Sequence, residues 1–163
     1  MKKVILYAIF ILVATIWAGD EKCNLTEPSL SQDVTYDASL PSGSCQQIGY
    51  VCNLGFNIVD ENNMMFFNLG AEASCTNLLK SKQFRTRATP NSTTYTANSN
   101  FTLIENEENM GPLSLTLAGS LAMLAVNNNI PVDIIYKKVD SLYFNGIKLQ
   151  SIKILNMNGT ANP

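Results

Sequence analysis

The sequence predicts a mainly β domain with a single helix (α+β), held together by disulfides and preceded by a secretion signal. Three observations lead to this fold class. Apolar and polar residues alternate over residues 47 to 59, which is the period of a half-buried strand. One uncharged apolar segment, residues 111 to 126, is long enough for a helix. The cysteines form an even set of four: Cys23, Cys45, Cys52 and Cys75.

The chain begins with the features of a secretory signal peptide. Lys2 and Lys3 precede an uncharged apolar run over residues 4 to 18, and charge returns at Asp20. A charged start, a short apolar core and a small residue at the junction are typical of such signals, so we expect residues 1 to 18 to be cleaved after Ala18. The alternative is a membrane anchor, but the run falls short of the roughly 20 residues that a spanning helix needs. We therefore expect a secreted or periplasmic protein without a stable membrane anchor.

The charge of the chain argues against nucleic acid as a partner. Without the two lysines of the signal, nine basic residues face 13 acidic ones, which gives a net charge of −4. Arg85 and Arg87 are the only arginines, and no basic stripe could follow a phosphate backbone.

The absence of histidine removes several kinds of chemistry. Ser-His-Asp and Cys-His nucleophilic systems, histidine general bases and histidine-ligated metals are all excluded. Glycine-rich phosphate loops and nucleophile elbows are also missing. A carboxylate pair could still hydrolyse a glycoside, but the acidic residues are scattered or lie in polar runs such as residues 105 to 109. We expect no catalytic residue, no metal and no cofactor.

The four cysteines predict two disulfides, for which three pairings exist. Zinc is a poor alternative, because the sequence has no Cys-x-x-Cys spacing and no histidine. We expect Cys52, on the apolar face of its strand, to pair with Cys75 and fasten the loop that contains it. Cys45 would then pair with Cys23 and hold the N-terminal extension.

Residues 19 to 45 form this extension, which is rich in polar residues and has one short strand expected over residues 33 to 37. The long strand over residues 47 to 59 follows. Every second residue of it is apolar, and we expect this even-numbered set to face the core: Ile48, Tyr50, Cys52, Leu54, Phe56 and Ile58.

Turn residues and short apolar runs define the next elements. Residues 60 to 63 are turn-forming, and residues 64 to 70 are typical of the returning strand of a hairpin. Residues 71 to 98 form a long connection, and a short strand is expected over residues 101 to 104.

The helix is expected over residues 111 to 126. Pro112 suits its first position, and three asparagines followed by Pro131 end it. Apolar residues surround its axis, and no charge occurs between Glu108 and Asp133, so we expect it to be buried on more than one side. Either the N-terminal extension covers it, or it packs against its counterparts in an oligomer. The residues expected at such an oligomer contact are Leu115, Gly119, Met123 and Val126.

Two strands complete the domain, over residues 131 to 139 and 146 to 155. Ser151 interrupts the alternation of the second strand, so we expect a bulge or bend there. Residues 156 to 163 form a flexible tail. The order strand, strand, strand, helix, strand, strand over residues 46 to 155 is that of an OB-fold, a five-stranded Greek-key barrel.

The C-terminal half of this domain resembles a known family. LAGSLAMLAVNNNIPVDIIYKK, residues 117 to 138, has an apolar helix, a polar turn and a V-x-I-x-Y strand, and NGIKLQSIKIL follows at residues 145 to 155. This pattern is similar to that of subtilase-cytotoxin-like B subunits, which belong to the pentameric AB-type toxins. The resemblance covers about residues 46 to 155 and implies a glycan-binding barrel that assembles as a ring with its helices around the central pore. The chain departs from the family in having no cysteine between the last two strands, and no sugar-contacting residue can be matched.

These features favour an exported, non-catalytic binding module, most concretely a glycan-binding homo-oligomer similar to a toxin B subunit. Its partner would be a glycan or a host surface receptor. The expected contacts are Tyr95, Asn98 and Asn100, which combine an aromatic ring with amide groups on a polar loop. The alternatives are a monomeric secreted accessory or inhibitory protein that binds another protein, and a carboxylate-based hydrolase.

Overall fold

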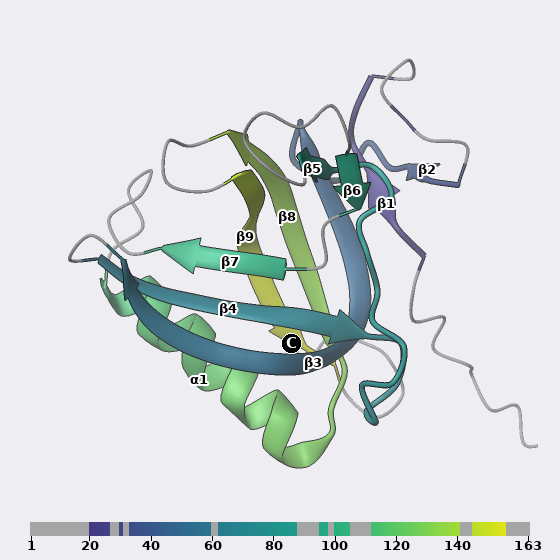
Figure 1. Cartoon of the computed structure of the whole chain (residues 1–163). Coiled ribbons are helices and arrows are strands. Elements are labelled where there is room, and N and C mark those ends of the chain that lie inside the picture. The colour runs from purple at the N-terminus through teal and green to yellow at the C-terminus, as the bar shows by residue number, and fades with distance from the viewer. Residues whose placement is uncertain are drawn as a thin grey trace, which may run out of the picture.

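The computed structural model of the chain is a mainly β fold with one helix (Figure 1). The predicted signal peptide and the predicted tail lie outside the described residues, so both stay predictions. The described residues are 20–26, 30, 33–59, 62–87, 95–97, 100–104, 112–140 and 145–155.

The predicted strands and helix occur in the predicted order, together with three further short strands, β1, β5 and β6. The elements are β1 (Lys22–Cys23), β2 (Thr35–Tyr36), β3 (Ser44–Val59), β4 (Asn62–Gly70), β5 (Arg85–Arg87), β6 (Tyr95–Ala97), β7 (Asn100–Ile104), α1 (Pro112–Asn128), β8 (Val132–Asp140) and β9 (Asn145–Ile154).

Seven of the strands form one mixed sheet in the order β2-β1-β3-β4-β7-β9-β8. In addition, β3 pairs with β8, so the five longer strands form a closed cycle of pairings. The pairs β1–β2 and β7–β9 are parallel, and the other pairs in this sheet are antiparallel. The sequence predicted five strands in the sheet; two more are present because the N-terminal extension contributes β1 and β2. The connection contains β5 and β6, which form a separate two-stranded sheet.

The length of β3 follows from its having two long partners. Its first part, from Ser44 to Gly49, pairs with β8, and its second part, from Tyr50 to Val59, pairs with β4. A strand of 16 residues spans about 50 Å at the usual rise per residue, which is more than a nine-residue partner can cover alone.

A bulge in β3 changes which residues face the core. The register with β4 shifts between Cys52 and Gly55, and Asn53 adopts a φ of 50°, a conformation that asparagine tolerates. Before the bulge the odd-numbered positions face the core, so the expectation is wrong for Ile48 and Tyr50, which are only partly buried. The inserted residue then brings the even-numbered positions to the core side, where Phe56 lies opposite the buried Met65 but beyond the core. Phe56 and Ile58 are 57 % and 68 % exposed. The odd-numbered positions before the bulge, Cys45, Gln47, Gly49 and Val51, are buried, and Ser44 and Cys52 are buried as well.

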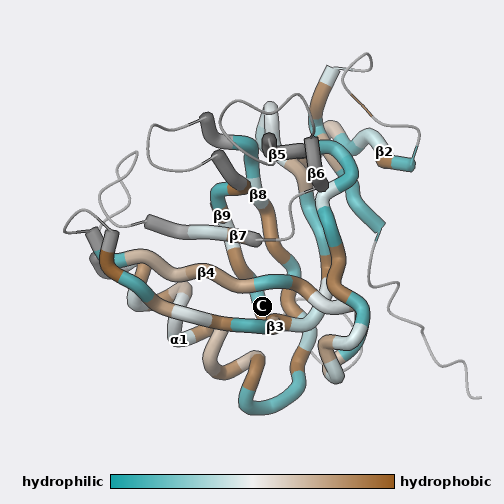
Figure 2. The backbone as a smooth tube through the Cα atoms, viewed as in Figure 1, coloured by the Kyte–Doolittle hydropathy of each residue, from teal (hydrophilic) through white to brown (hydrophobic). Residues whose placement is uncertain are grey.

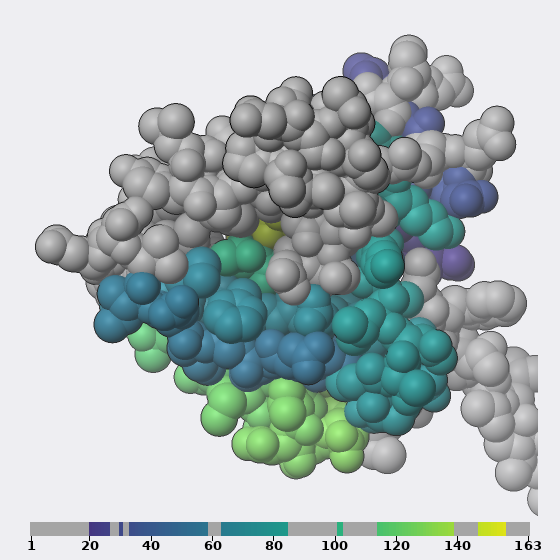
Figure 3. All heavy atoms as spheres, viewed as in Figure 1, coloured from purple at the N-terminus to yellow at the C-terminus, as the bar shows by residue number. Residues whose placement is uncertain are grey.

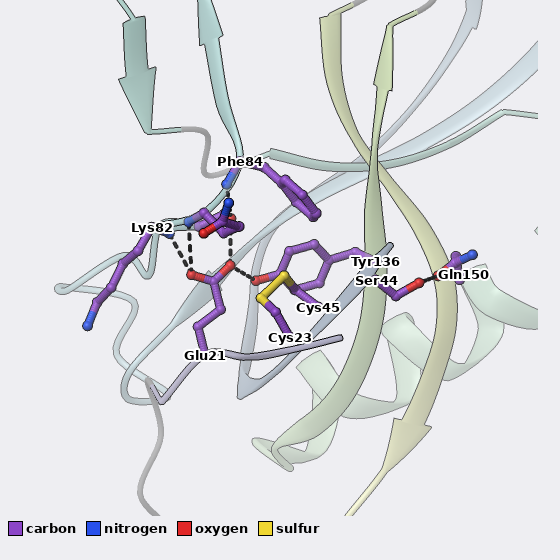
Figure 4. Close-up of a disulfide and its surroundings, with 10 residues drawn as sticks. Glu21, Cys23, Ser44, Cys45, Lys82, Phe84, Tyr136 and Gln150 are labelled. Atoms are coloured by element: carbon purple, nitrogen blue, oxygen red, sulfur yellow. Dashed lines mark hydrogen bonds between the residues drawn. A yellow bond between two sulfur atoms is a disulfide. The ribbon is translucent and has the colours of Figure 1, made fainter. Parts of the chain in front are cut away.

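A second bulge lies in β9. The register with β8 shifts so that Ser151 and Leu149 oppose neighbouring residues of β8, which leaves Gln150 as the extra residue. The bulge predicted at Ser151 is thus confirmed to within one residue. Gln150 accepts a hydrogen bond from Ser44 Oγ, which ties the bulge to the start of β3 (Figure 4).

One hydrophobic core lies within the cycle of strands. Phe101 on β7 is at its centre, with ring centroids 5.7 Å from Phe67 and 4.9 Å from Tyr136. Phe84 lies edge-on to Tyr136 at 5.9 Å. Hydrophobic residues (brown in Figure 2) follow β4, β8 and β9 toward this core. Edge-to-face and offset aromatic pairs each add about 0.5 to 1.5 kcal/mol beyond their buried area.

The helix α1 packs against β3, β4 and β9. Pro112 begins it, as predicted. Asn129 follows its last residue with a φ of 52°, and Ile130 N donates to Ala125 O, which is the arrangement of a left-handed C-terminal cap. The asparagines in the sequence therefore end the helix through a specific backbone conformation.

The two disulfides join Cys23 to Cys45 and Cys52 to Cys75, which are the expected pairs. Cys23 and Cys45 also face each other in the β1–β3 pairing, so the extension is an edge of the sheet rather than a loose strand. In Figure 1, β1 and β2 lie away from α1.

Candidate interaction surface on helix α1

The exposed side of α1 is uncharged and carries four large apolar residues among small polar ones. Leu117 and Leu124 are 60 % and 50 % exposed, and Met123 and Val126 are 47 % and 39 % exposed. The helix carries no charged residue over its 17 positions. Isolated apolar residues on a surface are ordinary, but several on one uncharged helix are typical of an interaction site.

The N-terminal extension does not cover this surface. Its described strands pair with each other and with the start of β3, which holds them through the Cys23–Cys45 disulfide. Leu117 and Leu124 are exposed with the extension in place. The expectation that the extension covers the helix is therefore wrong for the described residues.

A groove of about 660 Å³ lies between α1 and the hairpin formed by β3 and β4. Figure 3 shows the atoms of β3 and β4 (blue) directly beside those of α1 (green). A Cβ atom on Gly119 would lie 3.0 Å from Phe56 Cε1, so this glycine allows the exposed ring to rest on the helix. The wall of the groove is apolar, with uncharged amide and hydroxyl groups among it: Phe56, Asn57, Ile58, Asn63, Met64, Leu115, Thr116, Gly119, Ser120 and Met123.

Two smaller hollows border the same helix. One of about 240 Å³ lies between α1 and β9 and includes Leu117 and Leu121. The other, of about 270 Å³, lies beside the Cys52–Cys75 disulfide and includes Val126. The exposed leucines of α1 therefore form a ridge with hollows along its sides.

The structure separates the four helix residues expected at an oligomer contact. Leu115 and Gly119 face the sheet and are buried, whereas Met123 and Val126 are exposed. Sequence reasoning did not include Leu117 and Leu124, which are more exposed. The spacing of the alanines could have predicted this exposure. Ala118, Ala122 and Ala125 form the buried face of the helix, so larger residues on its other sides are exposed.

The residues expected to contact a glycan stay untested. Tyr95 begins β6 and Asn100 begins β7, but their side chains, like all of Asn98, lie outside the described parts of the structure.

A buried polar cluster lies at the other end of the sheet, around Glu21 (Figure 4). Glu21 is 1 % exposed, and its carboxylate accepts hydrogen bonds from four donors. Tyr136 Oη and Ser81 Oγ donate to Oε1 at 2.5 and 2.6 Å, and the backbone N–H groups of Lys82 and Gln83 donate to Oε2 at 2.7 and 3.2 Å. Sequence reasoning missed this cluster, because its members are far apart in the chain.

The cluster connects three segments without a cation at the carboxylate among the described residues. Burial, followed by the charge of Glu21 and its hydrogen bond, raises the pKa of Tyr136 well above its usual value. The donor atoms of Glu21, Cys23 and Cys45 lie within 4.8 Å of one another, but both sulfur atoms are in a disulfide and cannot act as thiolate ligands. The hydrogen bonds of this cluster therefore join Glu21, residues 81 to 83 and Tyr136, which indicates a structural role.

The sequence matches no protein-family model and no curated protein. Within the described residues, no helix is both long enough and apolar enough to span a membrane.

Proposed function

We infer that the five longer strands form an OB-fold. The support is the cycle of pairings β3-β4-β7-β9-β8, with α1 placed between β7 and β8 in the chain. In an OB-fold the helix also stands between the third and fourth strands of a five-stranded Greek key.

We propose that the chain is an exported, non-catalytic binding module that assembles with copies of itself through α1. The observation that carries this proposal is the set of four exposed large apolar side chains on a helix without charges: Leu117, Met123, Leu124 and Val126. Such a face is unfavourable in water, and burying it against another chain removes that cost. A second copy brings a surface with the same absence of charge, so no unpaired charge is buried in the contact.

The two disulfides are typical of a protein that resides outside the cytoplasm. The resemblance to toxin B subunits then suggests a glycan or a host surface receptor as the ligand of the assembly. Tyr95, Asn98 and Asn100 stay the candidate contacts.

The native mass of residues 19 to 163, measured by size-exclusion chromatography with light scattering, tests this proposal. We expect a defined multiple of the mass of one chain. Replacing both Leu117 and Leu124 with Asp should reduce the mass to that of one chain, because two charges would be buried in the contact. Tyr36→Asp is the matched control, since Tyr36 is 54 % exposed on β2, away from α1.

A single-chain mass for the unaltered protein would contradict self-assembly. It would favour a monomeric accessory protein that offers α1 to a different partner. Binding of the oligomer to a glycan array, lost on replacing Tyr95 with Ala while the native mass stays unchanged, tests the choice of ligand.

A further inference from the structure

The exposed surface around α1 has two different parts. The first is the ridge, which we define as Leu117, Leu121 and Leu124. Leu117 and Leu124 are exposed, Leu121 is half-buried, and Leu117 and Leu121 border the hollow beside β9. The second is the groove between α1 and the β3–β4 hairpin, represented by Phe56 and Ile58. Both parts border α1: the ridge carries the exposed ends of Leu117 and Leu124, and the second part is the larger hollow.

Neither part contains a charged residue. The groove combines two exposed apolar side chains of β3 with apolar side chains of α1, and it is larger than the two hollows on the other sides of the helix. A ridge of leucines is chemically matched to such a hollow, since leucine presents only apolar atoms. Each copy of the chain therefore carries both a projecting part and the site that could receive it.

The area of the helix alone is too small for a stable contact between two ridges. A helix of 17 residues is about 25 Å long and about 10 Å wide, so its outer face covers on the order of 250 Å². A standard interface buries about 800 Å² on each partner. Insertion of the ridge into a groove enlarges the contact, because the hairpin of β3 and β4 is then buried together with the helix.

We propose that the ridge of one copy binds in the groove of the next. This inference rests on the proposed self-assembly and specifies its geometry. The contact is heterologous, because the two copies use different residues, and each copy keeps a free ridge or a free groove for a further copy. Such a contact produces a closed ring if the rotation between copies closes, and a filament if it does not.

Two variants test this geometry. The ridge variant carries Leu117→Asp and Leu124→Asp, and the groove variant carries Ile58→Asp, at a position that is 68 % exposed. Each variant alone should have the mass of one chain. An equimolar mixture should give a 1:1 dimer and no larger species, because only the intact ridge of the groove variant fits the intact groove of the ridge variant.

The results separate this inference from the proposed function. A single-chain mass for the unaltered protein overturns both. If the unaltered protein is an oligomer but the mixture of the two variants has the mass of one chain, only the heterologous contact is overturned. A groove variant that still assembles by itself has the same consequence. Leu117→Ala with Leu124→Ala is a milder ridge variant that keeps helix propensity, and it should weaken assembly about tenfold or more. Far-ultraviolet circular dichroism identifies any Asp variant that fails to fold. In that case the native mass of the variant with Leu117→Ala and Leu124→Ala is the test, and unchanged assembly of this variant overturns the proposal.

Discussion

Tyr136 on β8 donates a hydrogen bond of 2.5 Å to Glu21, which lies 115 positions earlier in the chain just before β1. This bond joins the N-terminal extension to the centre of the sheet. It also joins a buried carboxylate to the ring that packs on Phe101 and Phe84 in the core. The stability of the extension and of the core should therefore depend on each other.

Replacing Glu21 with Gln should lower the free energy of unfolding by about 2 to 4 kcal/mol. The amide keeps one acceptor oxygen but turns an NH₂ group toward backbone donors that now have no acceptor. Urea denaturation with the disulfides intact measures the change. Glu72→Gln is the control, because Glu72 accepts a hydrogen bond from Asn77 at the surface, which the Gln oxygen can still accept, so this change should alter stability by about 0.5 kcal/mol or less. Equal effects for both variants would contradict a structural role of the buried cluster.

The raised pKa of Tyr136 predicts a loss of stability at alkaline pH. Tyrosine in the unfolded chain loses its proton at a pH of about 10, whereas the folded protein keeps it bound to higher pH. The contribution of Tyr136 is therefore complete below pH 10 and falls above it by about 1.4 kcal/mol per pH unit until its own pKa is reached. Urea midpoints from pH 8 to 11 should show a steeper decline for the unaltered protein than for Tyr136→Phe. Parallel curves would sink this prediction.

The two disulfides should differ in their access to reductant. Cys23 and Cys45 are fully buried, whereas Cys75 is partly exposed beside a hollow at the surface. Thiol–disulfide exchange requires a thiolate to reach one of the sulfur atoms, so the Cys52–Cys75 bond should be reduced first. Alkylation and peptide mass spectrometry after limited reduction of the folded protein would identify the bond. Removing either bond by double replacement with Ser should cost about 3 kcal/mol, because the closed loops have similar lengths.

Two glycines should respond in opposite ways to replacement with Ala. A Cβ on Gly49 would lie 2.8 Å from the backbone oxygen of Gly70, which cannot move without disturbing β4, so Gly49→Ala should cost about 1 to 3 kcal/mol. A Cβ on Gly119 would crowd the end of the Phe56 ring, which is exposed and can turn aside, and would make an ordinary contact with Met65 Sδ at 3.8 Å. Gly119→Ala should therefore gain up to about 1 kcal/mol from helix propensity. Thermal unfolding of both variants compares the two signs, and a destabilised Gly119→Ala would show that the ring is fixed.

Much of the element order follows from local patterns in the sequence. Pro112 and the asparagines before Pro131 define the helix, because one supplies a fixed φ and the others accept a left-handed cap. Ser151 indicates the bulge of β9 because it breaks a regular alternation. These signals concern neighbouring residues and need no knowledge of the rest of the fold.

The features that were missed depend on distant parts of the chain. The alternation in β3 could not reveal that Asn53 is an inserted residue, since the insertion exists only relative to β4. Phe56 and Ile58 were expected inside, and Phe56 does lie opposite the buried Met65, but both are beyond the core and border the groove beside α1. In the sequence, Glu21 has the pattern of a charged surface segment. Only the fold shows that Tyr136 and Ser81, which are distant in the chain, donate hydrogen bonds to it.

The pairing of β3 with β8 also sets the order of events during folding. Ser44 is paired with Lys137, and the partner strand becomes available only after about 90 further residues have been synthesised or exported. Until then, the first part of β3 has an open edge on that side, and an open edge can bind other chains. The early link of Cys23 to Cys45 lies on this same part of β3 and places β1 along its other edge. A protein that emerges from its N-terminus would therefore keep this edge of β3 open until β8 arrives, and it would close the cycle of strands only when β9 has joined β7 and β8. Folding rates should follow the arrival of these last two strands.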